Sequence, residues 1–166
     1  MTMLRDVIPS EAKKQVKIGV MKKKLLEKIR NIILDLFKEK TVLIIVFGSY
    51  VKGDWTESSD IDILAIVKEP EKGLKRYKKI FDMFDEELMG KVDITILNET
   101  ILKKPRGIIF DAIDTGEVIF DKNDFFKKLK NKLTDLKLKK VIEKKYCSGF
   151  PYWRINNAQE ISRGLY

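Results

Sequence analysis

Two kinds of hydrophobic pattern alternate along the chain. Largely apolar runs with the length and β-branched content of buried strands lie at 42–47, 61–67, 91–97 and 116–120. Helical spacing of apolar residues occurs at 10–39, 71–89, 107–113 and 123–145. This alternation predicts an α/β (α+β) sandwich, in which a small mixed sheet of about four strands is flanked by helices.

Two of the predicted helices carry a clear inward stripe, which core packing explains without any further function. The stripe of 71–89 consists of Leu74, Tyr77, Phe81, Phe84 and Leu88. The stripe of the lysine-rich helix 123–145 consists of Phe126, Leu129, Leu133 and Leu136. An aromatic tail without a clear pattern follows. We therefore expect a domain at 1–122, with the C-terminal helix and aromatic tail of 123–166 packed on it or extending it.

Composition narrows the chemistry that the chain can perform. Its 166 residues suffice for one domain with a proper core. The chain has no histidine, which excludes histidine-based zinc sites and Ser-His nucleophiles, and Cys147 is its only cysteine. A bound metal would have to be a hard cation such as Mg²⁺ or Mn²⁺. We see no secretory signal and no membrane-spanning stretch, so we expect a cytoplasmic protein that does not enter a membrane.

The net charge of +9 leaves two interpretations open. Basic chains often bind nucleic acid, anionic membranes or phosphorylated small molecules. A solvated surface rich in lysine and glutamate, common in proteins from hot environments, gives the same balance. Composition alone does not choose between them.

Two carboxylates stand at the start of the second predicted strand. Asp60 and Asp62 are two residues apart, so they point to the same side of the strand. Without a partner they would raise each other's pKa and destabilise the fold, and a divalent cation removes that conflict. Asp93 has a similar place at the start of the strand 91–97. If the two strands are neighbours, three carboxylates converge at one edge of the sheet, as in a site for two metal ions.

The first predicted strand ends in Gly48-Ser49. A glycine at this place allows a tight turn and lets a phosphate approach the backbone closely. A helix that begins at Ser49 would direct free N–H groups toward that phosphate. Lys52 is equally compatible with a phosphate contact and with a solvated surface. One end of the stretch 48–62 thus suits phosphates and the other suits a metal.

These residues carry a resemblance to a known family. Gly48-Ser49, ten further residues and then Asp60-Ile61-Asp62 resemble the GS-x10-DxD signature of the nucleotidyltransferase superfamily that includes DNA polymerase β. The chain is most similar to its minimal, MNT-type members, over roughly residues 25 to 120. Tyr50-Val51-Lys52-Gly53 fits the family pattern after the serine, and Ser59 fits it before the first aspartate. Asp93 matches the third carboxylate of the family.

The resemblance implies a fold, a reaction and a set of roles. It implies a nucleotidyltransferase fold that uses Mg²⁺ or Mn²⁺ and takes ATP or another nucleoside triphosphate as substrate. Asp60, Asp62 and Asp93 would be the catalytic and metal-binding residues, and Gly48, Ser49 and Lys52 would bind the nucleotide. The acceptor implied for MNT-type members is a tyrosine of a HEPN-type toxin in a toxin–antitoxin system. A homo-oligomer is left open.

Two other functions remain as alternatives. The fold could neutralise a partner by binding alone, as a non-catalytic antitoxin. Transfer could also be to RNA or to a small molecule such as an aminoglycoside, because the lysine-rich segment is followed by aromatic residues that could stack on bases. No recognisable RNA-binding motif is present, so nucleic acid is not the favoured partner.

Overall fold

A computed structural model describes residues 10–53, 56, 58–70, 73–98, 104 and 106–164 of the chain. Residues 71–72 of the predicted helix 71–89 and residues 165–166 of the tail lie outside this description. The helices are α1 (Ser10–Phe37), α2 (Ser49–Lys52), α3 (Lys75–Phe81), α4 (Gly107–Thr115), α5 (Phe125–Leu138) and α6 (Ala158–Gly164), with a 3-10 turn at Lys38–Lys40. The strands are β1 (Thr41–Phe47), β2 (Ile61–Val67), β3 (Val92–Leu97), β4 (Glu117–Asp121), β5 (Ile142–Cys147) and β6 (Phe150–Ile155).

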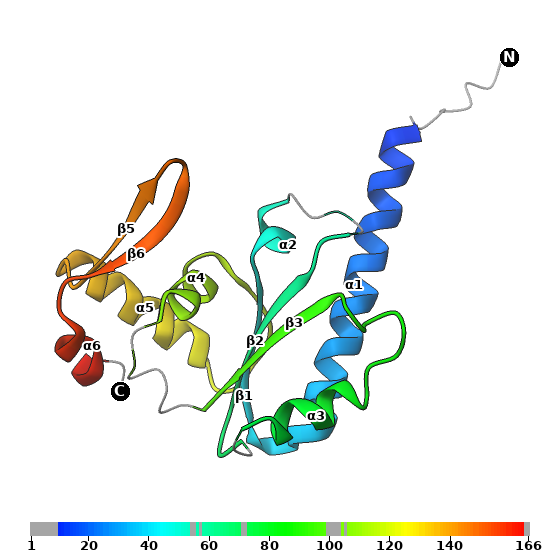
Figure 1. The fold of residues 1–166 in the computed structure, drawn as a ribbon, viewed down its shortest axis with the longest axis horizontal. Coiled ribbons are helices and arrows are strands. Elements are labelled where there is room, and N and C mark those ends of the chain that lie inside the picture. Colours follow the sequence, from blue (N-terminus) through cyan, green and yellow to red (C-terminus); the bar gives the residue numbers. More distant parts are fainter. Residues whose placement is uncertain are drawn as a thin grey trace, which may run out of the picture.

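The first four strands form one mixed sheet in the order β3-β2-β1-β4. β1 is antiparallel to both β2 and β4, whereas β2 and β3 are parallel. All seven residues of β1 are buried, which is why its sequence is a continuous apolar run. The predicted sandwich with a small mixed sheet is therefore confirmed (Figure 1).

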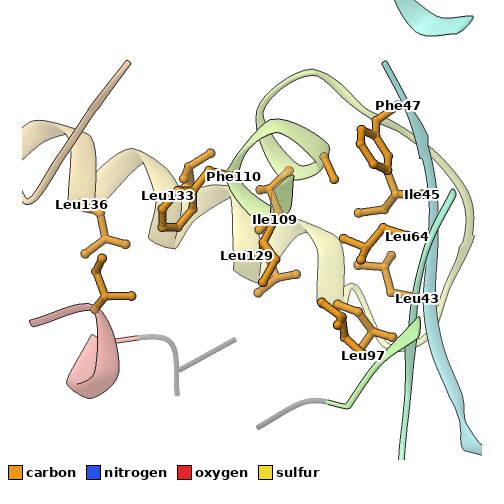
Figure 2. Packing of buried hydrophobic residues seen from close by; sticks show 14 of the residues in the cluster. Leu43, Ile45, Phe47, Leu64, Leu97, Ile109, Phe110, Leu129, Leu133 and Leu136 are labelled. Carbon is orange, nitrogen blue, oxygen red and sulfur yellow. The ribbon is translucent and has the colours of Figure 1, made fainter. Parts of the chain in front are cut away.

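Helices cover both faces of this sheet. α1 and α3 lie on one face, where Ile29, Ile33 and Ile80 pack against alternate residues of the strands. α4 and α5 cover the other face, and Figure 2 shows their side chains meeting those of β1, β2 and β3. Each fully buried isoleucine, leucine or phenylalanine stabilises the fold by about 1.5–3 kcal/mol relative to exposure. Among the described residues, no helix is long and apolar enough to cross a membrane.

The prediction for residues 71–89 is wrong in extent and partly wrong in its inward stripe. α3 covers only Lys75–Phe81, and Leu74 and Phe81 are 84% and 41% exposed. The helix instead directs Ile80 into the core, which shifts its buried face by one position. Phe84 and Leu88 are buried as expected, but they belong to the turns after the helix.

The predicted helix 123–145 is also too long. α5 ends at Leu138, where the N–H of Val141 bonds to the carbonyl of Leu136 and the N–H of Lys140 bonds to that of Lys137. Lys140 has a φ of 55°. This is a Schellman stop, in which a lysine holds the left-handed position that glycine usually takes. The inward positions Leu129, Leu133 and Leu136 are confirmed as buried.

The aromatic tail forms regular structure that the sequence interpretation missed. β5 and β6 pair as an antiparallel hairpin. Its turn is Ser148-Gly149, with φ values of 49° and 83°, and two positive φ angles are typical of a two-residue hairpin turn. Residues of α5, β5 and α6 join the same buried cluster as β1, and the domain boundary at residue 122 stays a prediction.

Candidate active site

The predicted site residues gather at one rim of the main sheet. β1 runs antiparallel to β2, and β2 runs parallel to β3, so the end of β1 meets the beginnings of β2 and β3. In the register, Phe47 is paired with Asp62 and Asp62 with Asp93. The three positions therefore form one row across three strands. The row lies on the face covered by α4 and α5, because Leu64 and Leu97 further along the same strands pack there.

Asp62 is the partly buried member of the predicted carboxylates, whereas Asp60 and Asp93 are exposed. Burial raises the pKa of Asp62 above its ordinary value, and the charges of Asp93 and then Asp60 raise it further. Lys52 opposes this effect. The rim thus carries more negative charge than Lys52 balances. The predicted neighbourhood of the two strands is confirmed, and it places Asp62 opposite Asp93. The convergence of all three carboxylates stays a prediction.

Gly48 makes the turn between β1 and α2. Its backbone has a φ of 75° and a ψ of −147°, a conformation that is essentially restricted to glycine. A Cβ placed at this position would lie 2.0 Å from Oδ2 of Asp62. The glycine therefore permits the turn, as predicted, and also leaves room for the Asp62 carboxylate, which the sequence did not reveal.

Ser49 and Lys52 are the first and last residues of α2. The predicted helix at Ser49 is therefore confirmed, but it is a single turn of four residues. The backbone N–H of Lys52 donates a hydrogen bond to the carbonyl of Gly48 at 3.3 Å. Lys52 is exposed at the rim and affects Asp62 electrostatically. A phosphate contact by either residue stays a prediction.

The donor set of this rim fits a hard divalent cation. The described residues contain no group of three or more carboxylate, histidine or cysteine side chains already assembled as a metal cage. Mg²⁺ does not need one, because it usually takes one or two carboxylates and completes its shell with water and substrate phosphates. The paired positions of Asp62 and Asp93 and the raised pKa of Asp62 suit such an ion.

Tyr50 of α2 and Glu117 of β4 lie beside this rim, and the sequence motif includes Tyr50 but not Glu117. Burial, followed by the charge of Glu117, raises the pKa of Tyr50 to about 12. The ammonium of Lys22 lies 4.6 Å from the centre of the Tyr50 ring and connects α1 to α2. The sequence signal for Glu117 was its place at the start of the fourth predicted strand. In the structure β4 begins beside the end of β1, where Val46 pairs with Glu117.

A mixed sheet with carboxylates beside a Gly-Ser turn is the arrangement that the sequence predicted for a nucleotidyltransferase. The sequence pattern of the nucleotidyltransferase domain family matches residues 26–157. The chain belongs to this family, which confirms the resemblance and makes the protein a nucleotidyltransferase.

Curated relatives come from Methanocaldococcus jannaschii. One, named "Putative protein adenylyltransferase MJ1305", is 34% identical over 118 residues, which cover 61% of this chain and 78% of that protein. Another, named "Putative protein adenylyltransferase MJ0128", is 39% identical over 77 residues, which cover 45% of this chain and 72% of that protein.

Solved structures share the fold. One, described as a crystal structure of a toxin-antitoxin with AMP-PNP, has a TM-score of 0.53 at 20% identity and covers 69% of this chain and 87% of that one. A second, of a mutant of the toxin-antitoxin MntA-HpeT, has a TM-score of 0.50 at 17% identity and covers 71% and 87%. At these identities the likeness concerns the fold.

Proposed function

We propose that the protein is a Mg²⁺-dependent adenylyltransferase that moves AMP from ATP to a hydroxyl group of another protein. The observation that carries the proposal is the row of Asp62 and Asp93 on neighbouring strands, with the Gly48 turn against Asp62. The relatives named as protein adenylyltransferases support AMP as the group and protein as the acceptor.

Each residue at the rim has a proposed part in the reaction. Asp60, Asp62 and Asp93 would hold two Mg²⁺ or Mn²⁺ ions, which when bound supply neutralisation of the triphosphate charge and activation of the attacking oxygen. Gly48 and Ser49 position the β- and γ-phosphates, and Lys52 adds a positive charge. The acceptor oxygen forms a bond to the α-phosphorus while the bond to pyrophosphate breaks. Asp93 takes the proton of the acceptor hydroxyl.

The acceptor that we propose is a tyrosine of a HEPN-type toxin, with this protein as the antitoxin. The family resemblance implies that partner, and the two structural neighbours are described as toxin-antitoxin structures. We place the reaction in the cytoplasm, where ATP is available and where the exposed thiol of Cys147 would stay reduced.

Intact-mass analysis tests the whole proposal. The protein encoded beside this one is mixed with it, Mg²⁺ and each nucleoside triphosphate in turn. We expect AMP adducts on the partner with ATP, and none with EDTA or with the Asp62→Asn variant. The matched control is Asp35→Asn, which removes an exposed carboxylate on α1 and should leave transfer unchanged. A stable complex without an adduct would contradict the proposed catalysis and indicate that the protein neutralises its partner by binding.

A further inference from the structure

Nearly all of the net positive charge lies in one part of the chain. The segment 125–155, which contains α5, β5 and β6, has ten lysine or arginine residues and two carboxylates. It therefore carries eight of the nine net positive charges of the protein. Such segregation along a chain points to a polyanionic partner rather than to a uniformly solvated surface.

The outer side of α5 presents much of this charge. Leu129, Leu133 and Leu136 face the core, while Lys127, Lys128 and Lys130 are exposed. Within the part of the chain that the structure describes, none of these three lysines forms an ion pair. The two carboxylates of the segment are already engaged within it, in the pairs Lys139–Asp135 and Lys145–Glu143.

The hairpin adds exposed aromatic rings to this charge. Phe150 and Tyr152 are 77% and 48% exposed, and they lie two residues apart on β6, so they project from the same face about 7 Å apart. Arg154 continues that row, and Lys145 pairs with Tyr152 across the hairpin. Figure 1 shows the far end of the hairpin projecting from the body of the protein.

The opposite face of the hairpin is held firmly to α4. The Trp153 ring packs against Phe110 with 5.4 Å between centroids, and its Nε1 donates to Oδ1 of Asp111 at 2.9 Å. Lys144 donates to Asp114 at 3.1 Å. Burial opposes the ionisation of Asp114, but its two lysine partners outweigh burial and lower its pKa. The exposed rings therefore stand on a braced hairpin and are not a consequence of loose packing.

We propose that the outer side of α5 and the outer face of the hairpin bind single-stranded RNA. The lysines of α5 contact phosphates, and Phe150 and Tyr152 stack on unpaired bases. An acidic protein surface is the less suitable partner, because protein interfaces favour arginine over lysine, and the segment has nine lysines and one arginine. The hydroxyl group of Tyr152 on this face and that of Ser148 in the hairpin turn can bond to the 2′-hydroxyl that distinguishes RNA from DNA.

Fluorescence anisotropy with a labelled oligouridylate tests this proposal on the full chain. In the variant Lys127→Gln/Lys128→Gln/Lys130→Gln, the slope of log K against log salt should decrease in magnitude by about 2, that is, ~0.7 for each lost phosphate contact. The variant Phe150→Ala/Tyr152→Ala should raise Kd at least about tenfold. Circular dichroism verifies that each variant is folded.

Two controls make the result specific. The variant Lys24→Gln/Lys75→Gln/Lys78→Gln removes the same charge from exposed positions on or beside α1 and α3, and should bind RNA with little change. Asp62→Asn should bind RNA like the wild type, since the proposal does not depend on the rim. Equal weakening in the lysine control, or wild-type affinity without the two rings, would overturn the proposal. So would equal competition by oligothymidylate, duplex RNA or polyglutamate.

Discussion

The carboxylate of Asp62 occupies the space that a side chain at Gly48 would need. A Cβ at Gly48 would lie 2.0 Å from Oδ2 of Asp62, and the φ of 75° at Gly48 is itself unfavourable for other residues. The end of β1 and the start of β2 are thus fitted to each other. The Gly-Ser turn of the family signature sets the position of the signature's second aspartate as well as the path of the backbone.

Gly48→Ala should therefore damage both stability and transfer. The backbone conformation alone should cost about 1–3 kcal/mol, and the new methyl group displaces the Asp62 carboxylate. Transfer by the folded variant should fall at least about tenfold, because displaced catalytic groups lose that much or more. Denaturant unfolding and the partner-labelling assay measure the two effects.

The matched control is Gly53→Ala. Gly53 also has a positive φ, of 86°, but no atom lies within 4 Å of a Cβ built there. This variant should lose about 1 kcal/mol of stability and keep its transfer rate. Equal transfer rates in the Gly48 and Gly53 variants would contradict a special fit between Gly48 and Asp62.

Asp62→Asn should abolish transfer without unfolding the protein. The loss should be about 10²–10³-fold or more, the usual effect of deleting a group that stabilises charge in the transition state. Stability at neutral pH should stay the same or increase, because the fold disfavours the ionised Asp62 carboxylate. Single-turnover labelling and thermal unfolding measure the two quantities, with Asp35→Asn as the control. Wild-type transfer by the Asp62 variant would remove Asp62 from the mechanism.

In the presence of EDTA, the wild type and Asp62→Asn should differ in how their free energy of unfolding depends on pH. Because burial and the charges of Asp93 and Asp60 raise the pKa of Asp62, the folded protein holds this proton more tightly than the unfolded chain does. The free energy of unfolding should therefore fall as pH rises from the ordinary value of 3.8 through the raised pKa. Asp62→Asn should lack this part of the decrease. Parallel curves for the two proteins would contradict the raised pKa.

Magnesium should stabilise the wild-type protein through the row of Asp62 and Asp93. At ten times its dissociation constant, a ligand that binds only the folded state adds about 1.4 kcal/mol, which corresponds to a rise in Tm of roughly 3–5 °C. Asp93→Asn should reduce this rise, because one member of the row can no longer ligate the ion. NaCl at equal ionic strength is the control. An equal rise in the wild type and in Asp93→Asn would exclude Asp93 as a ligand.

The strands and the rim were predictable because they follow from local rules. Strands buried on both faces appear as apolar runs, and the predicted bounds 61–67 are those of β2. Alternation predicts that Asp60 and Asp62 share one side, but only Asp62 lies within β2, so this part stays a prediction. The pairing of Asp62 with Asp93 required one further assumption, that the two strands are neighbours, which the parallel register supplies. The contact of Asp62 with Gly48 joins two turns in space and has no counterpart in the sequence pattern.

The C-terminal part was less predictable because its signals are atypical. The stop of α5 depends on a positive φ at Lys140, and lysine gives no sign of it. The charged residues at 143–145 continue the composition of the helix, although they belong to β5. In the same way, the stripe expected for 71–89 assumed one unbroken helix, whereas Phe84 and Leu88 reach the core from turns.

Trp153→Phe should loosen the hairpin while leaving the main sheet intact. The substitution keeps a ring beside Phe110 but removes the hydrogen bond from Nε1 to Asp111, a loss that should destabilise the fold by about 1 kcal/mol. The matched control on the same hairpin is Tyr152→Phe, which removes one hydroxyl from a half-exposed ring and should stay within about 0.5 kcal/mol of the wild type. Amide hydrogen exchange should accelerate in β5 and β6 of the Trp153 variant but not in β1 and β2. If both variants exchange like the wild type, the hydrogen bond to Asp111 does not brace the hairpin, and the packing of the Trp153 ring together with the Lys144–Asp114 contact holds it against α4.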